Sequence, residues 1–209
     1  MDKKKKVTDV IKILKQLFPV AKTALNYSNS FELLAAVIMS AMCTDKAVNK
    51  TTAVLFKKYP KLDDYVKADP AEFEKDMSSI NFYKSKAKNI LASAKIIKEE
   101  YNGEIPRTME EMLQLPGVAR KTANIVLGGA HGIIAGIPVD THVKRLTYLL
   151  GLTTNTDPVK IEEDLMQIVP KKEWHDFSFR LIDYGRAYCK ARPHDHATCP
   201  LSKYYIVQK

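Results

Sequence analysis

A lysine stands in a local setting that favours nucleophilic chemistry. The segment Leu115–Ala119 (LPGVA) is typical of a tight turn, because Pro116 restricts φ and Gly117 tolerates a positive φ. We expect a helix to begin near Ala119, so that its unpaired N–H groups form a site for a phosphate. Lys121 falls in the first turn of that helix, where the helix dipole disfavours positive charge. The setting therefore favours a neutral amine, which is a nucleophile.

An aspartate nearby in the sequence has the context of a helix N-cap. Asp140 precedes apolar residues at helical spacing, which are Val143, Leu146, Leu149 and Leu150. A carboxylate in that place stays ionised, because the N–H groups and the dipole favour its charged form. It can accept a proton or stabilise a developing cation. The two residues also have ordinary explanations, a surface helix lysine and a cap, and spacing alone favours these.

Both motifs resemble those of the endonuclease III family of DNA glycosylases. Leu115–Asn124 (LPGVARKTAN) is similar to that family's helix-hairpin-helix, and Val139–His142 (VDTH) is similar to the segment that carries its second catalytic residue. Further matching segments follow in order along the chain: Phe31–Thr52, Ile80–Ile90, Tyr101–Pro106 and His175–Cys189. The hairpin with Lys121 together with VDTH is the most specific part of the resemblance, since related glycosylases that only remove the base lack that lysine. Ala119 departs from the pattern, because many relatives have a second glycine there.

The resemblance implies a bifunctional enzyme of base excision repair. It would be a DNA glycosylase with AP lyase activity that removes oxidised pyrimidines and cuts the strand by β-elimination. Lys121 would form a Schiff base with the sugar, Asp140 would assist, and no diffusible cofactor or catalytic metal would be needed. The DNA contacts expected from the matching motifs are Leu115, Gly117, Ala119, Arg120, Lys84 and His142.

Two further residues stand at positions where members of the family insert side chains into the gap that a flipped base leaves in the duplex. Met42 takes the place of a frequent glutamine, and Phe82 matches a second wedge position. An apolar wedge fills a base gap but forms no hydrogen bond with the orphaned base, so a strict preference for the opposing base is not expected. The alternative to a wedge role is, for each of these two residues, ordinary packing in the core. Lys84, Lys86 and Lys88 either contact phosphate or form one solvated helix face.

Other functions remain open at this point. The first alternative keeps the chemistry but changes the lesion to mismatched thymine, pyrimidine dimers or abasic sites only. The second is a DNA-binding protein with reduced catalysis, although the presence of both Lys121 and Asp140 argues against it. An unrelated helical protein would have to explain the ordered match along almost the whole chain.

The remaining sequence predicts an all-α fold without internal repeats. Expected helices lie near residues 7–18, 31–42, 48–59, 70–77, 85–101, 119–129, 141–150, 158 onward and 173–188. Asn29 with Glu32 resembles a capping box, Ser85 is expected to cap the helix 85–101, and Thr108 with Glu111 forms a capping box for the first helix of the hairpin motif. Family resemblance implies two lobes with a DNA groove between them, across which Lys121 and Asp140 would face each other. One would be a six-helix lobe, residues 23–134, with the helix-hairpin-helix at about 108–130. The other would combine residues 1–22 and 135–209.

The C-terminal segment departs from the family. Endonuclease III proteins usually carry four cysteines spaced C-x6-C-x2-C-x5-C that hold a 4Fe–4S cluster. The equivalent positions here are Cys189, His196, Cys199 and Tyr205. Such clusters are held by thiolates and tyrosine is no substitute, so we expect no 4Fe–4S cluster in the loop 189–205. Packing would replace the cluster, with Tyr204, Tyr205 and Ile206 as candidates to fill the space.

A zinc ion is the alternative at this loop. Cys189, His194, His196 and Cys199 offer four nitrogen and sulfur ligands, although their spacing matches no standard zinc module. Leftover cysteines at a degenerate cluster site explain Cys189 and Cys199 equally well. The remaining cysteine, Cys43, is expected to be a buried apolar residue.

Composition agrees with a nucleic-acid partner. The chain has 209 residues, of which 45% are hydrophobic, and 33 basic against 24 acidic residues give a net charge of +9. This charge is suited to binding double-stranded DNA, but a soluble basic protein without a nucleic-acid partner can have the same charge. No signal peptide or membrane span is expected, since charges interrupt residues 7–18 and glycines interrupt residues 125–139. We expect a monomer in the cytoplasm, associated with the nucleoid in a prokaryote.

Overall fold

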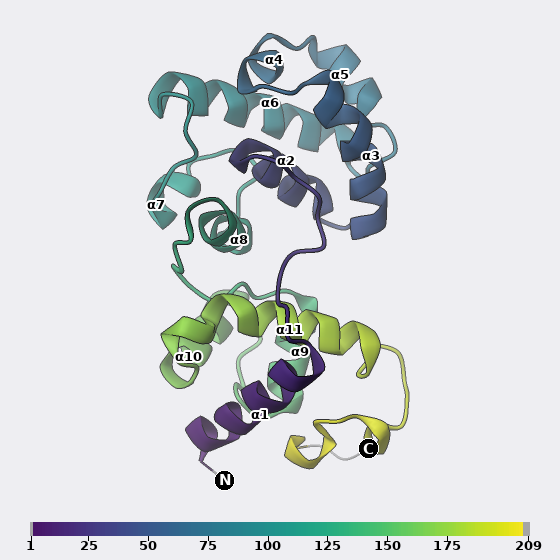
Figure 1. Cartoon of the computed structure of the whole chain (residues 1–209), viewed down its shortest axis with the longest axis vertical. Helices are drawn as coiled ribbons and strands as arrows, with labels where there is room; N and C mark the ends of the chain where they lie inside the picture. The colour runs from purple at the N-terminus through teal and green to yellow at the C-terminus, as the bar shows by residue number, and fades with distance from the viewer. Residues whose placement is uncertain (1, 207–209) are drawn as a thin grey trace. The chain divides into compact units, whose positions relative to one another are not determined.

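The computed structural model describes residues 2–206 and divides into two compact units. One unit is Ala24–Ala135, and the other combines Met1–Thr23 with Gly136–Lys209. Every regular element among the described residues is a helix, which confirms the predicted all-α class (Figure 1). No helix in this part of the chain is long and apolar enough to cross a membrane.

The unit Ala24–Ala135 contains seven helices. They are α2 (Ser30–Ser40), α3 (Asp45–Lys58), α4 (Leu62–Lys67), α5 (Pro70–Asp76), α6 (Tyr83–Glu100), α7 (Met109–Met112) and α8 (Arg120–His131). Six helices were expected for this lobe, and the additional one is α4. The short helix α4 has no apolar periodicity of its own, and Tyr65 anchors it by a fully buried ring stacked edge-on against Phe31 and Phe73.

Helix α2 forms the centre of this unit. All residues from Phe31 to Met39 are buried, so α2 is covered on every side, as expected for an apolar helix of this kind. Helix α8 lies beside it (Figure 1). The Leu33 side chain of α2 packs directly on Gly129 of α8, where an added Cβ would lie 2.5 Å from Leu33 Cδ2. This contact fixes the far end of the helix whose first turn carries Lys121.

The start of α6 differs from the prediction. Ser85 was expected to cap it, but the helix begins at Tyr83, after Phe82 in the left-handed conformation with φ 58°. The Ser85 hydroxyl instead donates a hydrogen bond to the Phe82 carbonyl at 3.1 Å. Helix α6 therefore begins without a side-chain cap.

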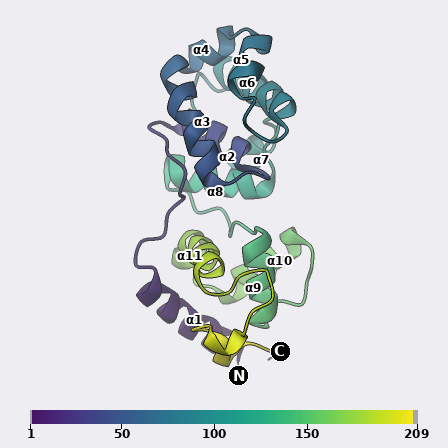
Figure 2. The same ribbon diagram turned by 90° about the vertical axis from the view of Figure 1, so that its right-hand side faces the viewer.

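The second unit packs α1 (Lys3–Leu17), α9 (Thr141–Leu149), α10 (Pro158–Ile168) and α11 (Trp174–Ala187), with single 3-10 turns at Lys171–Glu173, His196–Thr198 and Ser202–Tyr204. Figure 2 shows α1 running past α11 in this unit. The Arg180 side chain, buried in α11, donates to the Phe18 carbonyl at 3.1 Å and pairs with Asp176 at 3.0 Å. Two chain segments far apart in sequence are thereby joined.

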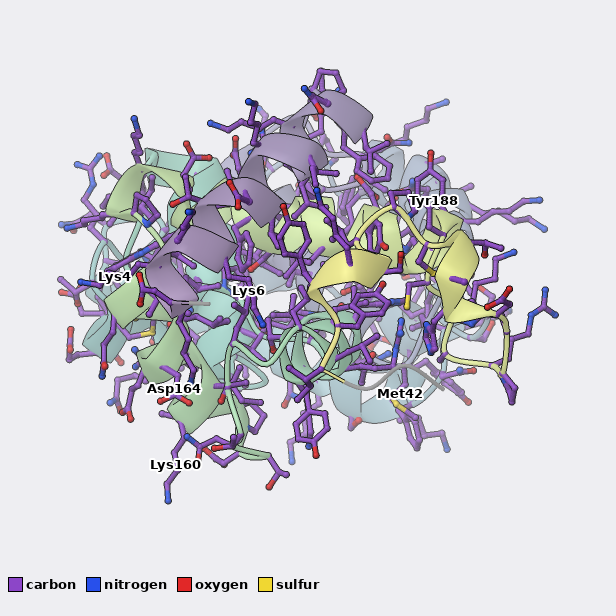
Figure 3. The ribbon with its side chains drawn as sticks, turned by 90° about the horizontal axis from the view of Figure 1, so that it is seen from below. Lys4, Lys6, Met42, Lys160, Asp164 and Tyr188 are labelled. Carbon is purple, nitrogen blue, oxygen red and sulfur yellow. The ribbon has the colours of Figure 1, made fainter. Side chains whose placement is uncertain are left out.

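The C-terminal segment is attached to α1 and α9. Lys6 Nζ, labelled in Figure 3, donates to the carbonyls of Leu150 at 2.9 Å and Tyr204 at 3.4 Å. The Ile206 N–H donates to the Leu149 carbonyl at 2.9 Å. Tyr204 and Tyr205 are buried, whereas Ile206 is 54% exposed and only partly fills the space expected of it.

Candidate active site and metal-binding cluster

The hairpin before Lys121 is built by backbone geometry and by a close contact with α6. Gly117 has φ +78°, and the Val118 N–H donates to the Leu115 carbonyl at 3.1 Å to close the turn. A Cβ on Gly117 would lie 2.7 Å from Asn89 Nδ2, so glycine is required for space as well as for conformation. Ser93 Oγ, also on α6, donates to the Pro116 carbonyl at 3.1 Å.

Helix α8 begins without a side-chain cap. Ala119 occupies the N-cap position in an extended conformation and has no side chain able to accept from the first N–H groups. Helix starts that lack a capping side chain leave backbone donors for an anion, and the dipole adds to the attraction. Lys121 is exposed in the first turn, so its amine is accessible from solvent. The turn thus places an uncapped helix start and an exposed lysine amine within a few residues.

Asp140 is the N-cap of α9. Its Oδ1 accepts a hydrogen bond from the Val143 N–H at 2.8 Å, which confirms the predicted cap. Oδ2 accepts no hydrogen bond from any residue in the described part of the chain. The carboxylate is therefore oriented through one oxygen while the other can meet a substrate group. Asp140 belongs to the unit Gly136–Lys209 and Lys121 to the unit Ala24–Ala135.

The other predicted DNA contacts differ in exposure. Leu115 is 2% exposed and offers the surface little beyond its backbone, whereas Lys84 is exposed on α6 and Arg120 is half-buried. His142 packs beside α11, where a Cβ on Gly185 would lie 2.5 Å from the His142 ring. That ring is therefore close against a neighbouring helix.

The two predicted wedge residues project from adjacent loops of one unit. Met42 and Phe82 both have φ 58°, a left-handed conformation that is uncommon for such side chains, and they are 78% and 67% exposed. The Asn81 side chain donates to the Met42 carbonyl at 2.7 Å and links the loops. Their exposure rules out the core alternative for both residues. Backbone strain that displays two apolar side chains is typical of a functional surface.

A buried lysine supports the Met42 loop. Lys86 is 6% exposed, and its Nζ donates to the Met39 carbonyl at 2.9 Å, the Ala41 carbonyl at 2.5 Å and Cys43 Sγ at 3.5 Å. Both alternatives expected for Lys86, a phosphate contact and a solvated face, were wrong. Its three N–H donors meet three acceptors at the end of α2. Cys43 is also half-buried in this loop and not the buried core residue that was expected.

The C-terminal loop brings two cysteines and two histidines together. The Cys189, His194, His196 and Cys199 ligand atoms all lie within 4.8 Å of one another. Cys189 Sγ is 3.7 Å from His196 Nδ1, and Cys199 Sγ is 3.3 Å from His194 Nε2. This cluster could hold a metal ion, and we call it the Cys2His2 cluster.

The residues of this loop do not fit a four-thiolate iron–sulfur cluster. The family positions of the second and fourth thiolates are held by His196 and Tyr205, and the chain's third cysteine, Cys43, belongs to the other unit. The Tyr205 hydroxyl is 2.9 Å from the Tyr184 hydroxyl. Burial is also the main cause that raises the pKa of Tyr205 above the ordinary value, which keeps the phenol protonated. Tyr205 is therefore a packing residue.

Comparisons with known proteins identify the family. Residues 35–171 match the model of the HhH-GPD superfamily of base excision DNA repair proteins. The chain is 49% identical over 200 residues to endonuclease III of Synechocystis sp. (96% of this chain, 91% of the relative) and 47% identical over 186 residues to endonuclease III of Bacillus subtilis (88% and 84%). The chain belongs to the endonuclease III family.

Solved structures agree with this assignment. A non-covalent endonuclease III–DNA complex is similar with a TM-score of 0.92 and 40% identity, covering 99% of this chain and 96% of that one. A trapped covalent endonuclease III–DNA intermediate is similar with a TM-score of 0.93 and 40% identity, covering 99% of this chain and 97% of that one. A thermostable thymine-DNA glycosylase shares the fold at 23% identity with a TM-score of 0.84, covering 98% and 95%.

Proposed function

We propose that this base excision repair enzyme, a DNA glycosylase and AP lyase, uses Lys121 as its nucleophile and Asp140 as the assisting carboxylate. The observation that carries the proposal is the uncapped start of α8 after the tight hairpin, with Lys121 exposed in its first turn. It occurs in a chain that is 49% identical to an endonuclease III across almost its whole length. A solved relative is described as a trapped covalent intermediate with DNA, which suits a lysine nucleophile.

The proposed reaction begins at the sugar of the damaged nucleotide. The Lys121 amine lone pair forms a bond to C1′ while the glycosidic C–N bond breaks, and the base leaves as an anion with that electron pair and takes a proton from water. Asp140 takes the proton that the new C–N bond makes acidic and balances positive charge at the sugar. Opening of the sugar ring then yields a Schiff base between Lys121 and C1′.

The Schiff base makes strand cleavage possible. Its positive nitrogen acidifies C2′–H, so that loss of this proton is followed by expulsion of the 3′ phosphate in a β-elimination. Water finally releases the sugar fragment and restores the amine. These steps need no diffusible cofactor and no catalytic metal.

Duplex DNA with a damaged base or an abasic site is the proposed partner. Backbone N–H groups at Gly117 and Ala119 would hold a phosphate, with Arg120 and Lys84 adding positive charge. Met42 and Phe82 would fill the space left by the flipped nucleotide, because they are exposed and held in strained loops. We also propose that the protein acts as a monomer on DNA in the cytoplasm.

The proposed lesions are oxidised or ring-saturated pyrimidines. One observation favours a broader range of opposing bases than a hydrogen-bonding wedge would allow. Met42 is 78% exposed and apolar, so it can fill a gap but cannot hydrogen bond with the orphaned base. We therefore expect excision rates that change little when the base opposite the lesion is changed.

Borohydride trapping tests the proposal. The protein is incubated with a duplex containing thymine glycol and a duplex containing an abasic site, and borohydride reduces any Schiff base to a stable adduct. The wild-type protein should be trapped on both duplexes and Lys121→Gln on neither, whereas Lys95→Gln, a change on an exposed α6 lysine, should behave as wild type. Trapping only on the abasic duplex would contradict the glycosylase part of the proposal. Equal trapping of Lys121→Gln would contradict the assignment of the nucleophile.

A further inference from the structure

The Cys2His2 cluster has the geometry of a tetrahedral metal site. Zinc binds thiolate sulfur at about 2.3 Å and imidazole nitrogen at about 2.05 Å, so that a tetrahedral S···N edge is about 3.6 Å long. The two measured S···N separations, 3.7 Å and 3.3 Å, lie on either side of this value. No pair among the four ligand atoms is further apart than 4.8 Å. Only small side-chain movements would complete a tetrahedron.

The hydrogen bond of His194 selects the tautomer that a metal requires. Its Nδ1 is 3.0 Å from the carbonyl oxygen of Arg192. Because a carbonyl only accepts, Nδ1 must carry the proton, and the neutral ring then has its lone pair on Nε2. Nε2 is the atom that points at Cys199 Sγ. A backbone carbonyl that orients the ring through its other nitrogen is the usual outer partner of a metal-bound histidine.

One of the two sulfur ligands also has an outer partner. Arg145 Nη1 is 3.4 Å from Cys189 Sγ, and Arg145 Nη2 donates to the Cys189 carbonyl at 2.7 Å. The Cys199 thiol donates to the carbonyl of Tyr188, labelled in Figure 3, at 3.8 Å, and this hydrogen bond would be lost when a metal takes the place of the thiol proton. Both sulfurs are buried, with exposures of 0% for Cys189 and 3% for Cys199. Arg145 can thus stabilise the thiolate at Cys189 once a metal draws off its proton.

The cluster also has a route to solvent. A hollow of about 500 Å³ on the same unit is lined by both histidines of the cluster together with Arg145, Lys190 and Arg192. An ion can therefore reach the imidazole side of the cluster while the sulfur side stays covered.

We propose that Cys189, His194, His196 and Cys199 bind one structural zinc ion at the place where relatives are expected to hold an iron–sulfur cluster. Two thiolates and two neutral imidazoles form a site of zero net charge with Zn²⁺, and a closed tetrahedral set of this kind is typical of structural zinc. The ion joins the end of α11 to the turn His196–Thr198 and so stabilises the C-terminal segment. It takes no part in the reaction at Lys121.

Metal analysis of the full chain, purified without a histidine tag or chelators, tests this inference. The expected result is about one zinc ion per chain, with neither stoichiometric iron nor acid-labile sulfide. Replacement of zinc by Co²⁺ should give the intense visible bands of tetrahedral cobalt and a sulfur-to-cobalt charge-transfer band. A chain that stays metal-free at saturating zinc, a Cys189–Cys199 disulfide, or bound iron would each overturn the inference.

Variants separate metal binding from simple packing. His194→Ala and Cys199→Ser should lose the zinc, whereas His194→Cys should keep it because a Cys3His set also binds zinc. His175→Ala is the matched control, since His175 lies on α11 in the same unit beside Asp176 and Phe179 and is not one of the four clustered residues. Circular dichroism shows whether each variant is folded. Retention of zinc by His194→Ala, or its loss from His175→Ala, would refute the ligand assignment, independently of the trapping experiment on Lys121.

Discussion

Replacement of the buried lysine Lys86 by methionine is predicted to destabilise the unit Ala24–Ala135 strongly. Methionine keeps most of the side-chain volume and removes every donor. The carbonyls of Met39 and Ala41, which Lys86 Nζ contacts at 2.9 Å and 2.5 Å, would lose their side-chain donor. A hydrogen bond from a charged group contributes about 1.5 to 3 kcal/mol, so that two of them give a loss of at least about 3 kcal/mol. The unfolding equilibrium constant would rise by at least about 140-fold.

Urea denaturation followed by circular dichroism measures this loss, and hydrogen exchange locates it. Lys95→Met is the matched control, because Lys95 is exposed on the same helix and should change stability by less than about 0.5 kcal/mol. Exchange should increase most at the end of α2 and in the loop that carries Met42. A Lys86→Met protein within about 0.5 kcal/mol of the control would refute the assigned hydrogen-bonding role.

Further predictions concern the two candidate motifs and DNA binding. Asp140→Asn should slow β-elimination strongly and leave stability nearly unchanged, because asparagine still accepts from the Val143 N–H. Asp140→Ala should slow the reaction and also lose about 1 kcal/mol of stability. Equal rates for the wild type and Asp140→Asn would show that Asp140 is only a helix cap. Gly117→Ala should lower both stability and affinity for abasic DNA, with a backbone cost of about 1 to 2 kcal/mol from φ +78° alone. Adding Asn89→Ala should relieve only the steric part of that loss, and full recovery in the double variant would show that the backbone conformation is unimportant. Affinity for duplex DNA should fall steeply with added salt, and a flat salt response would contradict a phosphate-binding surface.

Local signals predicted the helices well. The caps at Asn29, Thr108 and Asp140 are all present, because each depends on one side chain and an N–H group three residues away. Glu32 differs from the prediction, because its carboxylate accepts from the Ser28 N–H at 2.6 Å instead of completing a capping box, and Ser85 does not cap α6. Motifs encoded within a few residues are thus readable from sequence.

Features that depend on distant segments were not predictable in the same way. Lys86 looked like one of three lysines on a solvated face, yet the end of α2, 45 residues earlier at Ala41, surrounds its amine. Nothing local marks Phe82 as the left-handed start of α6. The Cys2His2 cluster is an intermediate case. Its residue types were visible in the sequence, but only the fold shows that all four ligand atoms meet.

Mapping of the covalent adduct is the most direct test of the central assignment. The wild-type protein is trapped with borohydride on abasic DNA, digested with nuclease and protease, and its peptides are sequenced by mass spectrometry. The sugar remnant should be found on Lys121 and on no other lysine. A remnant on another residue, such as Lys84, would show that the exposed lysine at the start of α8 is not the nucleophile.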